Sequence, residues 1–329
     1  MRRMKFTGVG AYVPERVVTN HDLEKMMDTS DEWIQQRTGI VERRWVEPGL
    51  ENSDMAAKAT LAACQDAGCD VKDIDLIIYA TLSPEYLFPG TGVVLEKKLG
   101  LTRTPVLDIR NQCSGFLYGL AVANGMIASG MYQRILLVGS ELHSRGLNKS
   151  TAGRDVTVIF GDGAGATVLE ATDEDKGLID ILIHADGRYA EDLTCLLPSA
   201  RVEGFITPEQ VARGEHYPHM AGNKVFKHAI VKMPEAIQEV CKRNHLTPRD
   251  LDVLIPHQAN LRINEIVGRA LEIEPKVFNN IQKYGNTTAA SIPLAMRDAL
   301  DQGFLKPGHL LGLTAFGSGF TWGAALVRM

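Results

Sequence analysis

The chain alternates between short apolar runs and longer segments in which apolar residues recur every three or four positions. The short runs are rich in Val, Ile and Leu and predict buried strands, whereas the longer segments predict helices with one apolar face. A glycine follows each predicted helix, at Gly68, Gly100 and Gly130, where a left-handed residue commonly ends a helix. This order of elements predicts an α/β protein with a largely buried sheet. The expected strands are 76–82, 105–109, 134–140 and 166–170, and the expected helices are 53–67, 91–99 and 113–129.

The second part of the chain repeats features of the first part in the same order. Three pairs of segments match in sequence, and within one pair Gly130 and Gly303 stand at equivalent offsets. The repeat predicts two homologous halves, 1–172 and 173–329, packed about a pseudo-twofold axis. The matching pairs are 73–81 with 250–258, 113–140 with 286–315, and 160–170 with 316–327.

The repeat bears on chemistry because it relates loops at equivalent strand ends of the two halves. Cys113, His257 and Asn286 all lie on such loops, although they are far apart in the sequence. Packing about a pseudo-twofold axis is therefore expected to bring the three side chains into one pocket.

Cys113 is the candidate nucleophile. It falls at a short turn between an expected strand and an expected helix, where free N–H groups and the helix dipole stabilise negative charge. A cysteine in this position is expected to have a lowered thiol pKa and to react as a thiolate. The alternative is a buried structural cysteine, which is the usual fate of a free cysteine. The other cysteines lack such a setting: Cys64, Cys69, Cys195 and Cys241.

His257 and Asn286 supply hydrogen-bonding groups beside this candidate nucleophile. His257 follows the apolar run VLIP, at a strand end where α/β sheets commonly bind ligands. A neutral imidazole there can donate one N–H or exchange a proton. Asn286 lies in the loop YGNTTAAS, and its amide can stabilise a developing enolate without titrating. Either residue alone is more often structural, so the constellation of three carries the prediction.

Two glycine-rich segments have simpler expectations. GDGAG at 161–165 lacks the lysine of a phosphate-binding loop and is expected to form a tight turn in the sheet. AFGSGFTWG at 315–323 is expected to form a loop, and its backbone N–H groups near Gly317 to Gly319 can approach an oxyanion because few side-chain atoms intervene.

Composition excludes several classes of function. The net charge of −5 gives no bulk attraction to nucleic acid or to anionic membranes. No run approaches the roughly 20 apolar residues of a membrane span, and Gly8, Gly10 and Pro14 interrupt the N-terminal apolar run. A cytoplasmic protein is expected. The five scattered cysteines include no C-x-x-C pair, which argues against a zinc site and a disulfide framework.

Several motifs, in order, resemble the β-ketoacyl-acyl-carrier-protein synthase III family of the thiolase superfamily. The resemblance extends over essentially the whole chain, and it implies a five-layered αβαβα fold and a homodimer. The motifs are DTSDEWIQQRTGI (28–40), FGDGAGA (160–166), MAGNKVF (220–226), PHQANLRI (256–263), GNTTAASIP (285–293) and AFGSGFTWG (315–323).

The resemblance implies a decarboxylative Claisen condensation that needs no bound cofactor and no metal. Cys113 would take the acyl group from acyl-CoA, and His257 and Asn286 would support decarboxylation of malonyl-acyl-carrier-protein. Backbone N–H groups of Cys113 and Ser318 would hold the oxyanion. Ser318 stands where the family usually has glycine, which is a departure from its pattern.

The resemblance also assigns substrate and partner contacts. Trp33 and Arg154 would hold the CoA adenine between them by stacking and cation–π attraction, with Arg37 nearby and Asn260 also contacting CoA. Phe88 would reach the acyl pocket of the partner subunit. The basic residues that would meet the acidic acyl carrier protein are Lys227, Arg262 and Arg269.

Four further positions bear on this assignment. Asn111 and Gln112 precede Cys113 where the family usually has small residues, which can shift the choice of primer. Phe88 argues against head-to-head joining of two long acyl chains, because relatives with that activity carry a glutamate near this position. Pro234 falls inside an otherwise helical segment and predicts a kink.

Other functions remain open on the sequence. The nearest is a ketosynthase or acyltransferase of specialised metabolism with a different primer or acceptor. A second is a Cys-His-Asn hydrolase, which the same three residue types can serve. A third is a subunit that binds acyl carriers without catalysis, against which the presence of all three residues argues.

Overall fold

The computed structural model describes residues 3–329 and contains two large sheets. In the first sheet the strand order is β1-β7-β6-β4-β5. Strand β4 pairs in parallel with β5 and β6, whereas β7 pairs antiparallel with β6 and β1. The strands are β1 (Arg3–Tyr12), β4 (Leu76–Ala80), β5 (Val106–Ile109), β6 (Arg134–Glu141) and β7 (Gly163–Thr172).

The second sheet has the order β11-β12-β13-β8. Its pairs β11–β12, β12–β13 and β13–β8 are parallel, antiparallel and antiparallel, the same succession as β4–β6, β6–β7 and β7–β1. This correspondence is consistent with an internal repeat, and the boundary at residue 172 stays a prediction. The strands are β8 (Gly177–Ala185), β11 (Val253–Pro256), β12 (Leu310–Gly317) and β13 (Thr321–Arg328).

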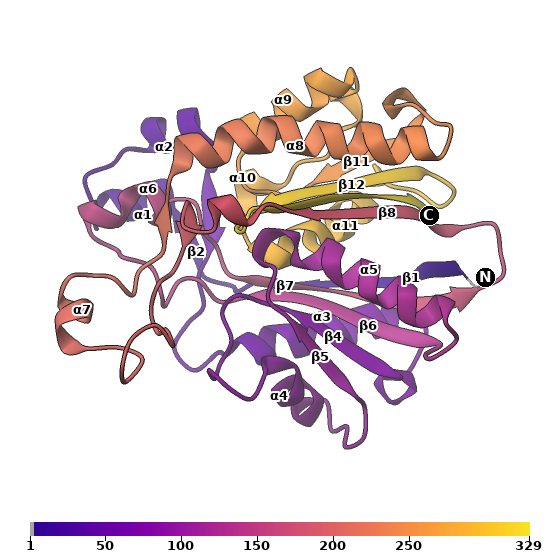
Figure 1. Cartoon of the computed structure of the whole chain (residues 1–329), viewed down its shortest axis with the longest axis horizontal. Helices are drawn as coiled ribbons and strands as arrows, with labels where there is room; N and C mark the ends of the chain where they lie inside the picture. The colour runs from indigo at the N-terminus through magenta and orange to yellow at the C-terminus, as the bar shows by residue number, and fades with distance from the viewer. Residues whose placement is uncertain (1–2) are drawn as a thin grey trace.

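Helices and sheets alternate in five layers, as Figure 1 shows. Helices α3 and α4 cover the outer face of the first sheet, α5 and α11 lie between the two sheets, and α8 and α9 cover the second sheet. This is the αβαβα arrangement that the resemblance implies. The helices are α3 (Asn52–Ala67), α4 (Thr91–Lys98), α5 (Gly115–Ala128), α8 (Gly222–Arg243), α9 (Leu261–Leu271) and α11 (Ser291–Asp301).

The central layer is apolar on several sides because it contacts both sheets. Phe116, Leu120 and Ile127 of α5 are fully buried and belong to one hydrophobic cluster with Leu137 of β6 and Leu313 of β12. Burying large side chains of this kind contributes about 1.5–3 kcal/mol each relative to exposure. Shared burial of this layer therefore holds the two sheets together.

The glycines that interrupt the N-terminal apolar run allow α3 to pack closely on β1. A Cβ atom on Gly8 would lie 2.1 Å from the carbonyl oxygen of Ala63, and one on Gly10 would lie 2.2 Å from that of Ala59. No larger residue fits at either position without moving the helix.

The smaller elements form the rim of the site and the surface. Four of them, α2, α6, β9 and β10, border the cavity described below. They are β2 (Val17–Thr19), α1 (Asn20–Glu24), α2 (Asp31–Thr38), β3 (Glu42–Arg44), α6 (Arg154–Thr157), β9 (Leu193–Thr194), α7 (Pro208–Ala212), β10 (His219–Met220) and α10 (Ile281–Tyr284). No helix within residues 3–329 is long and apolar enough to cross a membrane.

The expected strands and helices are present, and their ends differ by a few residues. The expected turn at 161–165 is wrong, because Gly163 already begins β7 and pairs with Glu141. The expected loop at 315–323 is shorter, since β12 extends to Gly317 and β13 begins at Thr321. Helix α8 continues as one element on both sides of Pro234.

Candidate active site

Cys113 lies in a one-turn 3-10 helix, Gln112–Ser114, that joins β5 to α5. Cys113 is buried, with 7 % of its surface exposed. Gly317, at the end of β12, packs directly against it, because a Cβ atom on Gly317 would lie 2.7 Å from the Cβ atom of Cys113. The segment after β5 and the end of β12 therefore meet at the thiol, and a glycine is required at position 317.

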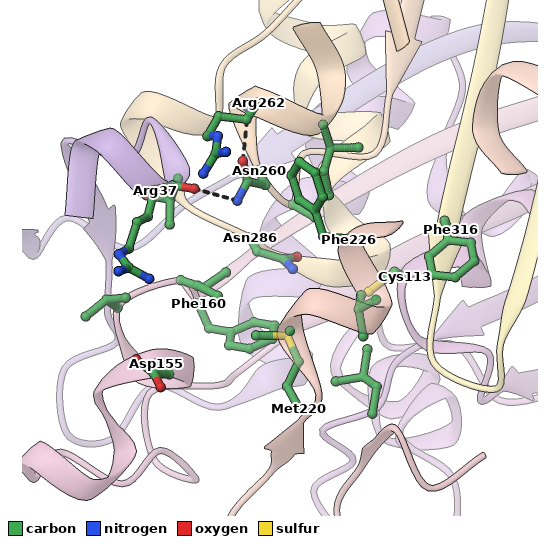
Figure 2. Close-up of a pocket in the computed structure, with 18 of the residues that line it drawn as sticks. Arg37, Cys113, Asp155, Phe160, Met220, Phe226, Asn260, Arg262, Asn286 and Phe316 are labelled. Atoms are coloured by element: carbon green, nitrogen blue, oxygen red, sulfur yellow. Dashed lines mark hydrogen bonds between the residues drawn. The ribbon is translucent and has the colours of Figure 1, made fainter. Parts of the chain in front are cut away.

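His257 and Asn286 reach the same place from the other half of the chain. His257 directly follows β11, and Asn286 follows α10 at Gly285. Together with Cys113 they line one cavity of about 410 Å³. Figure 2 shows the carboxamide of Asn286 beside Cys113 within this cavity. The structure thus brings together the three side chains that the sequence singled out, and their catalytic roles stay predictions.

His257 is a neutral hydrogen-bonding group. Burial lowers its pKa to about 3. Its Nδ1 lies 2.6 Å from Oγ of Ser291, which also accepts a hydrogen bond from the backbone N–H of Gln258 at 3.3 Å. Because the serine hydroxyl hydrogen has no other acceptor within residues 3–329, it can donate to Nδ1, which favours a proton on Nε2. Nε2 itself is buried and has no hydrogen-bond partner within residues 3–329, so it is available to a substrate.

The thiol of Cys113 differs from the sequence-based expectation. Burial, with a smaller contribution from the Glu141 carboxylate, raises the pKa of Cys113 to about 12. Hydrogen bonds from its own backbone N–H and from the Asn286 side chain lower the pKa by less. The expected lowered pKa is therefore wrong, because loss of water outweighs the effect of the helix start at this buried position.

This raised pKa predicts how the free enzyme reacts with iodoacetamide. Because only the thiolate is alkylated, the rate at Cys113 should rise about tenfold per pH unit between about pH 7 and pH 10. The measurement is the intact mass of the adduct against time, with peptide mapping to separate alkylation of the exposed Cys195. A rate that levels off below about pH 8 would instead indicate a thiol activated by the helix start.

The sequence predicts that the backbone N–H groups of Cys113 and Ser318 hold an oxyanion, and this role stays a prediction. The N–H groups of Cys113 and Ser318 donate no hydrogen bond to another residue within 3–329. The hydroxyl of Ser318 donates to the carbonyl oxygen of Leu193 at 2.5 Å. This contact explains how a serine is accommodated where glycine is usual.

Comparisons with known proteins agree with the geometry. The profile of 3-Oxoacyl-[acyl-carrier-protein (ACP)] synthase III matches residues 107–187, and that of its C terminal matches 241–329. The Beta-ketoacyl-[acyl-carrier-protein] synthase III of Nitratidesulfovibrio vulgaris (strain DP4) is 44% identical over 98% of this chain and 97% of its own. The chain belongs to the β-ketoacyl-acyl-carrier-protein synthase III family. It is therefore a condensing enzyme of the acyltransferase type.

Solved structures confirm the fold of this synthase III family member. The 3-oxoacyl-[acyl-carrier-protein] synthase III from Aquifex aeolicus VF5 is 38% identical, with a TM-score of 0.91 over 99% of this chain and 100% of the other. The priming β-ketosynthase from the R1128 polyketide biosynthetic pathway is 29% identical, with a TM-score of 0.90 over 100% of this chain and 96% of the other.

The outer end of the synthase III cavity is cationic and aromatic. Trp33 and Arg37 of α2 line it, and the guanidinium carbon of Arg37 lies 4.4 Å from the centre of the Trp33 ring. The guanidinium carbon of Arg154 lies 5.0 Å from the same ring. The two arginines therefore gather on Trp33, where the sequence predicts the adenine of CoA.

Asn260 also lines the cavity, but its side chain already has partners. Its Oδ1 accepts the backbone N–H of Arg262 at 2.9 Å and caps α9, and its Nδ2 donates to the carbonyl oxygen of Arg37 at 2.8 Å (Figure 2). The side chain thus joins α9 to α2. A direct contact with CoA, which stays a prediction, would have to share these atoms.

The remaining predicted residues lie away from the end of the cavity that contains Cys113. Arg262 lines the outer cavity, 5.4 Å from the ring of Phe226, whereas Lys227 and Arg269 are exposed on α8 and α9 and do not line the cavity. Phe88 is 82 % exposed and lies on the loop before α4, outside the cavity of its own chain. Its predicted role in a partner subunit's pocket is compatible with this exposure.

The sequence analysis missed two buried residues, Ser291 and Glu141, that affect His257 and Cys113. Ser291, which faces His257, begins α11 within the GNTTAAS motif, but nothing in that motif separates it from an ordinary helix-start serine. Glu141 is fully buried at the end of β6, and burial raises its pKa to about 7. A charged residue that ends an apolar run is a usable signal, which the sequence analysis did not weigh.

Proposed function

We propose that this synthase condenses an acyl-CoA primer with malonyl-acyl-carrier-protein to give a β-ketoacyl-carrier-protein. One observation carries the proposal: a buried thiol, a neutral imidazole with a free nitrogen and a carboxamide converge at the inner end of a cavity whose mouth carries Trp33 and Arg37. Each group suits one step of a thioester condensation.

In the first step the sulfur of Cys113 attacks the carbonyl carbon of acyl-CoA. The Cys113 proton leaves with the sulfur of CoA, and the acyl group remains on Cys113 as a thioester. The free N–H groups of Cys113 and Ser318 would stabilise the tetrahedral oxyanion. The raised thiol pKa is compatible with this order, because the proton need not leave before the substrate arrives.

In the second step malonyl-acyl-carrier-protein loses carbon dioxide. The electron pair of the broken carbon–carbon bond becomes an enolate, whose oxygen would receive hydrogen bonds from His257 Nε2 and the Asn286 amide. The enolate carbon then attacks the acyl thioester, a carbon–carbon bond forms, and the Cys113 sulfur leaves as a thiolate that takes a proton from water to restore the thiol. A neutral histidine suits this role, because burial keeps it uncharged while it donates. The reaction as written requires no metal or prosthetic group, and we place it in the cytoplasm.

The experiment is a panel of acyl-CoA primers read by intact-protein mass and by release of carbon dioxide from malonyl-carrier. A covalent adduct followed by stoichiometric carbon dioxide and β-ketoacyl-carrier supports the proposal. Acyl transfer without carbon dioxide would contradict it, and rapid hydrolysis of acyl-CoA without an acceptor would indicate a hydrolase.

A ketosynthase of specialised metabolism is the second candidate. Gln112, directly before the nucleophile, adopts a left-handed φ of 44°, and the bulky pair Asn111–Gln112 departs from the small residues usual in the family. The structural likeness to a polyketide priming ketosynthase is in keeping with an altered primer. The primer panel separates the candidates, because a preference for an unusual acyl group over acetyl-CoA would favour the second.

The proposed carrier surface predicts a selective kinetic effect. Arg262 and Arg269 are two turns apart on α9 and exposed, and Lys227 is exposed on the adjacent α8. Lys227→Glu combined with Arg269→Glu should raise the KM for malonyl-carrier about tenfold, since two exposed charge pairs of roughly 0.7 kcal/mol each are lost. The KM for acyl-CoA should not change, and added salt should diminish the difference.

The control is Lys242→Glu, which reverses a charge at the far end of α8. Equal effects of this control and the double variant would contradict a localised carrier surface.

We propose that the enzyme is a homodimer that buries the segment before α4. Tyr86, Leu87 and Phe88 are consecutive and 56 %, 55 % and 82 % exposed, an apolar surface of the kind that marks an interface. Phe88→Asp is expected to shift the mass measured by light scattering toward the monomer. Met131→Asp, at a residue 66 % exposed beyond α5, is the control and should leave the mass unchanged. A monomeric wild type would contradict the proposal.

A further inference from the structure

Asn286 is fixed by its backbone to the other half of the chain. Its N–H donates to the carbonyl oxygen of Ile159 at 2.8 Å, and its own carbonyl oxygen accepts the N–H of Gly161 at 3.1 Å. These bonds place the Cα atom but leave the rotation of the carboxamide undecided. A condensation that needs an N–H at the enolate oxygen also needs the amide to face the right way.

The side chain is oriented by Thr288. The backbone N–H of Thr288 donates to Oδ1 of Asn286 at 2.8 Å. Because an N–H can only be matched by an acceptor, this contact assigns the oxygen of the amide to Thr288 and leaves its NH₂ group for the site. The same NH₂ group is the one that can hydrogen-bond the Cys113 sulfur.

Thr288 itself adopts a backbone conformation that a branched residue rarely tolerates. Its φ is +51°, in the left-handed region, and the residue is fully buried. A left-handed β-branched residue is an outlier that persists only where the surroundings impose it. Without a restraint, relaxation of Thr288 would move the N–H that holds Asn286.

His143 supplies that restraint from the opposite half. Its Nε2 lies 2.7 Å from Oγ1 of Thr288, and both residues are buried. The imidazole is held in turn, since its ring centre lies 4.6 Å from that of Phe160 and its backbone N–H donates to Asp162 at 2.7 Å. Burial lowers the pKa of His143 to about 3, so it remains a neutral hydrogen-bonding group rather than a charge near the site.

We propose that His143 and Thr288 are positioning residues for the condensation, which together hold the Asn286 carboxamide with its NH₂ group toward the thiol and the malonyl unit. The inference rests on the proposed function of Asn286. It adds two residues that touch no substrate and act through the orientation of one amide.

The test compares the two half-reactions in His143→Leu and Thr288→Val. In both variants carbon dioxide release from malonyl-carrier should fall at least about tenfold, the factor for one misplaced hydrogen bond, while acylation of Cys113 stays within about threefold of wild type. Thr288→Ser and His143→Gln keep a neutral hydrogen-bonding group and should restore most of the lost rate. The double variant should lose no more than the worse single variant, because both changes break one contact.

Thr60→Val is the matched control. Thr60 is also fully buried, and its hydroxyl has no hydrogen-bond partner within residues 3–329, so the same substitution should change neither half-reaction. Unchanged carbon dioxide release in both single variants would overturn the inference, and so would equal losses in the two half-reactions. If one variant fails to fold, the other tests the same contact from its opposite end. A wild type that releases no carbon dioxide would instead refute the proposed function.

Discussion

Cys113→Ala is expected to abolish the acyl adduct and to lower the condensation rate by about 10⁴-fold or more, as loss of a nucleophile does in other covalent enzymes. The physical reason is that no other group in the cavity can form a thioester. Among the residues the structure describes, Cys113 is the one cysteine that lines the cavity, and a thioester can form only on a thiol. Intact-protein mass after incubation with acyl-CoA gives the measurement.

Cys64→Ala is the matched control for this experiment. Cys64 is also buried, and burial raises its pKa to about 12 as well, but it lies on α3 in the outer layer. It should keep both the adduct and the condensation. An acyl adduct that persists in Cys113→Ala would show that another residue is the nucleophile and would contradict the proposed mechanism.

Asn286→Ala and His257→Ala are expected to separate the two half-reactions. Each removes one donor from the developing enolate, so decarboxylation and condensation should fall about 10²–10³-fold, the usual effect of losing an oxyanion donor. Acylation of Cys113 should fall far less, because the backbone N–H groups of Cys113 and Ser318 stabilise that oxyanion. The measurements are carbon dioxide release from malonyl-carrier and the rate of adduct formation.

The control is Asn264→Ala, which removes a fully buried asparagine from α9 whose amide bonds Asn279 rather than the site. It should destabilise the fold without changing the ratio of the two half-reactions. Equal loss of both half-reactions in Asn286→Ala would show that Asn286 supports the site as a whole rather than the enolate.

The site works with neutral groups rather than with an ion pair. Burial keeps both the thiol of Cys113 and the imidazole of His257 uncharged near neutral pH. Catalysis then depends on oriented donors that are already in place when charge develops. Residues that orient these donors, such as Ser291 and Thr288, are therefore expected to influence the rate although neither lines the cavity.

The sequence determined the elements of the fold and the identity of the central residues. Apolar periodicity placed the main strands and helices within a few residues of their observed ends, because spacing along one segment decides which face it buries. The internal repeat and the family motifs pointed to Cys113, His257 and Asn286 together. These signals are local or ordered along the chain, so they can be read without coordinates.

Only the tertiary structure decided the electrostatics and the supporting contacts. The helix start at Cys113 predicts a lowered pKa, but enclosure by distant residues such as Gly317 removes water and reverses the direction. The contact between His143 and Thr288 joins the two halves and has no counterpart in local sequence. Burial and hydrogen-bond partners depend on residues remote in the chain, and packing alone determines which of them meet.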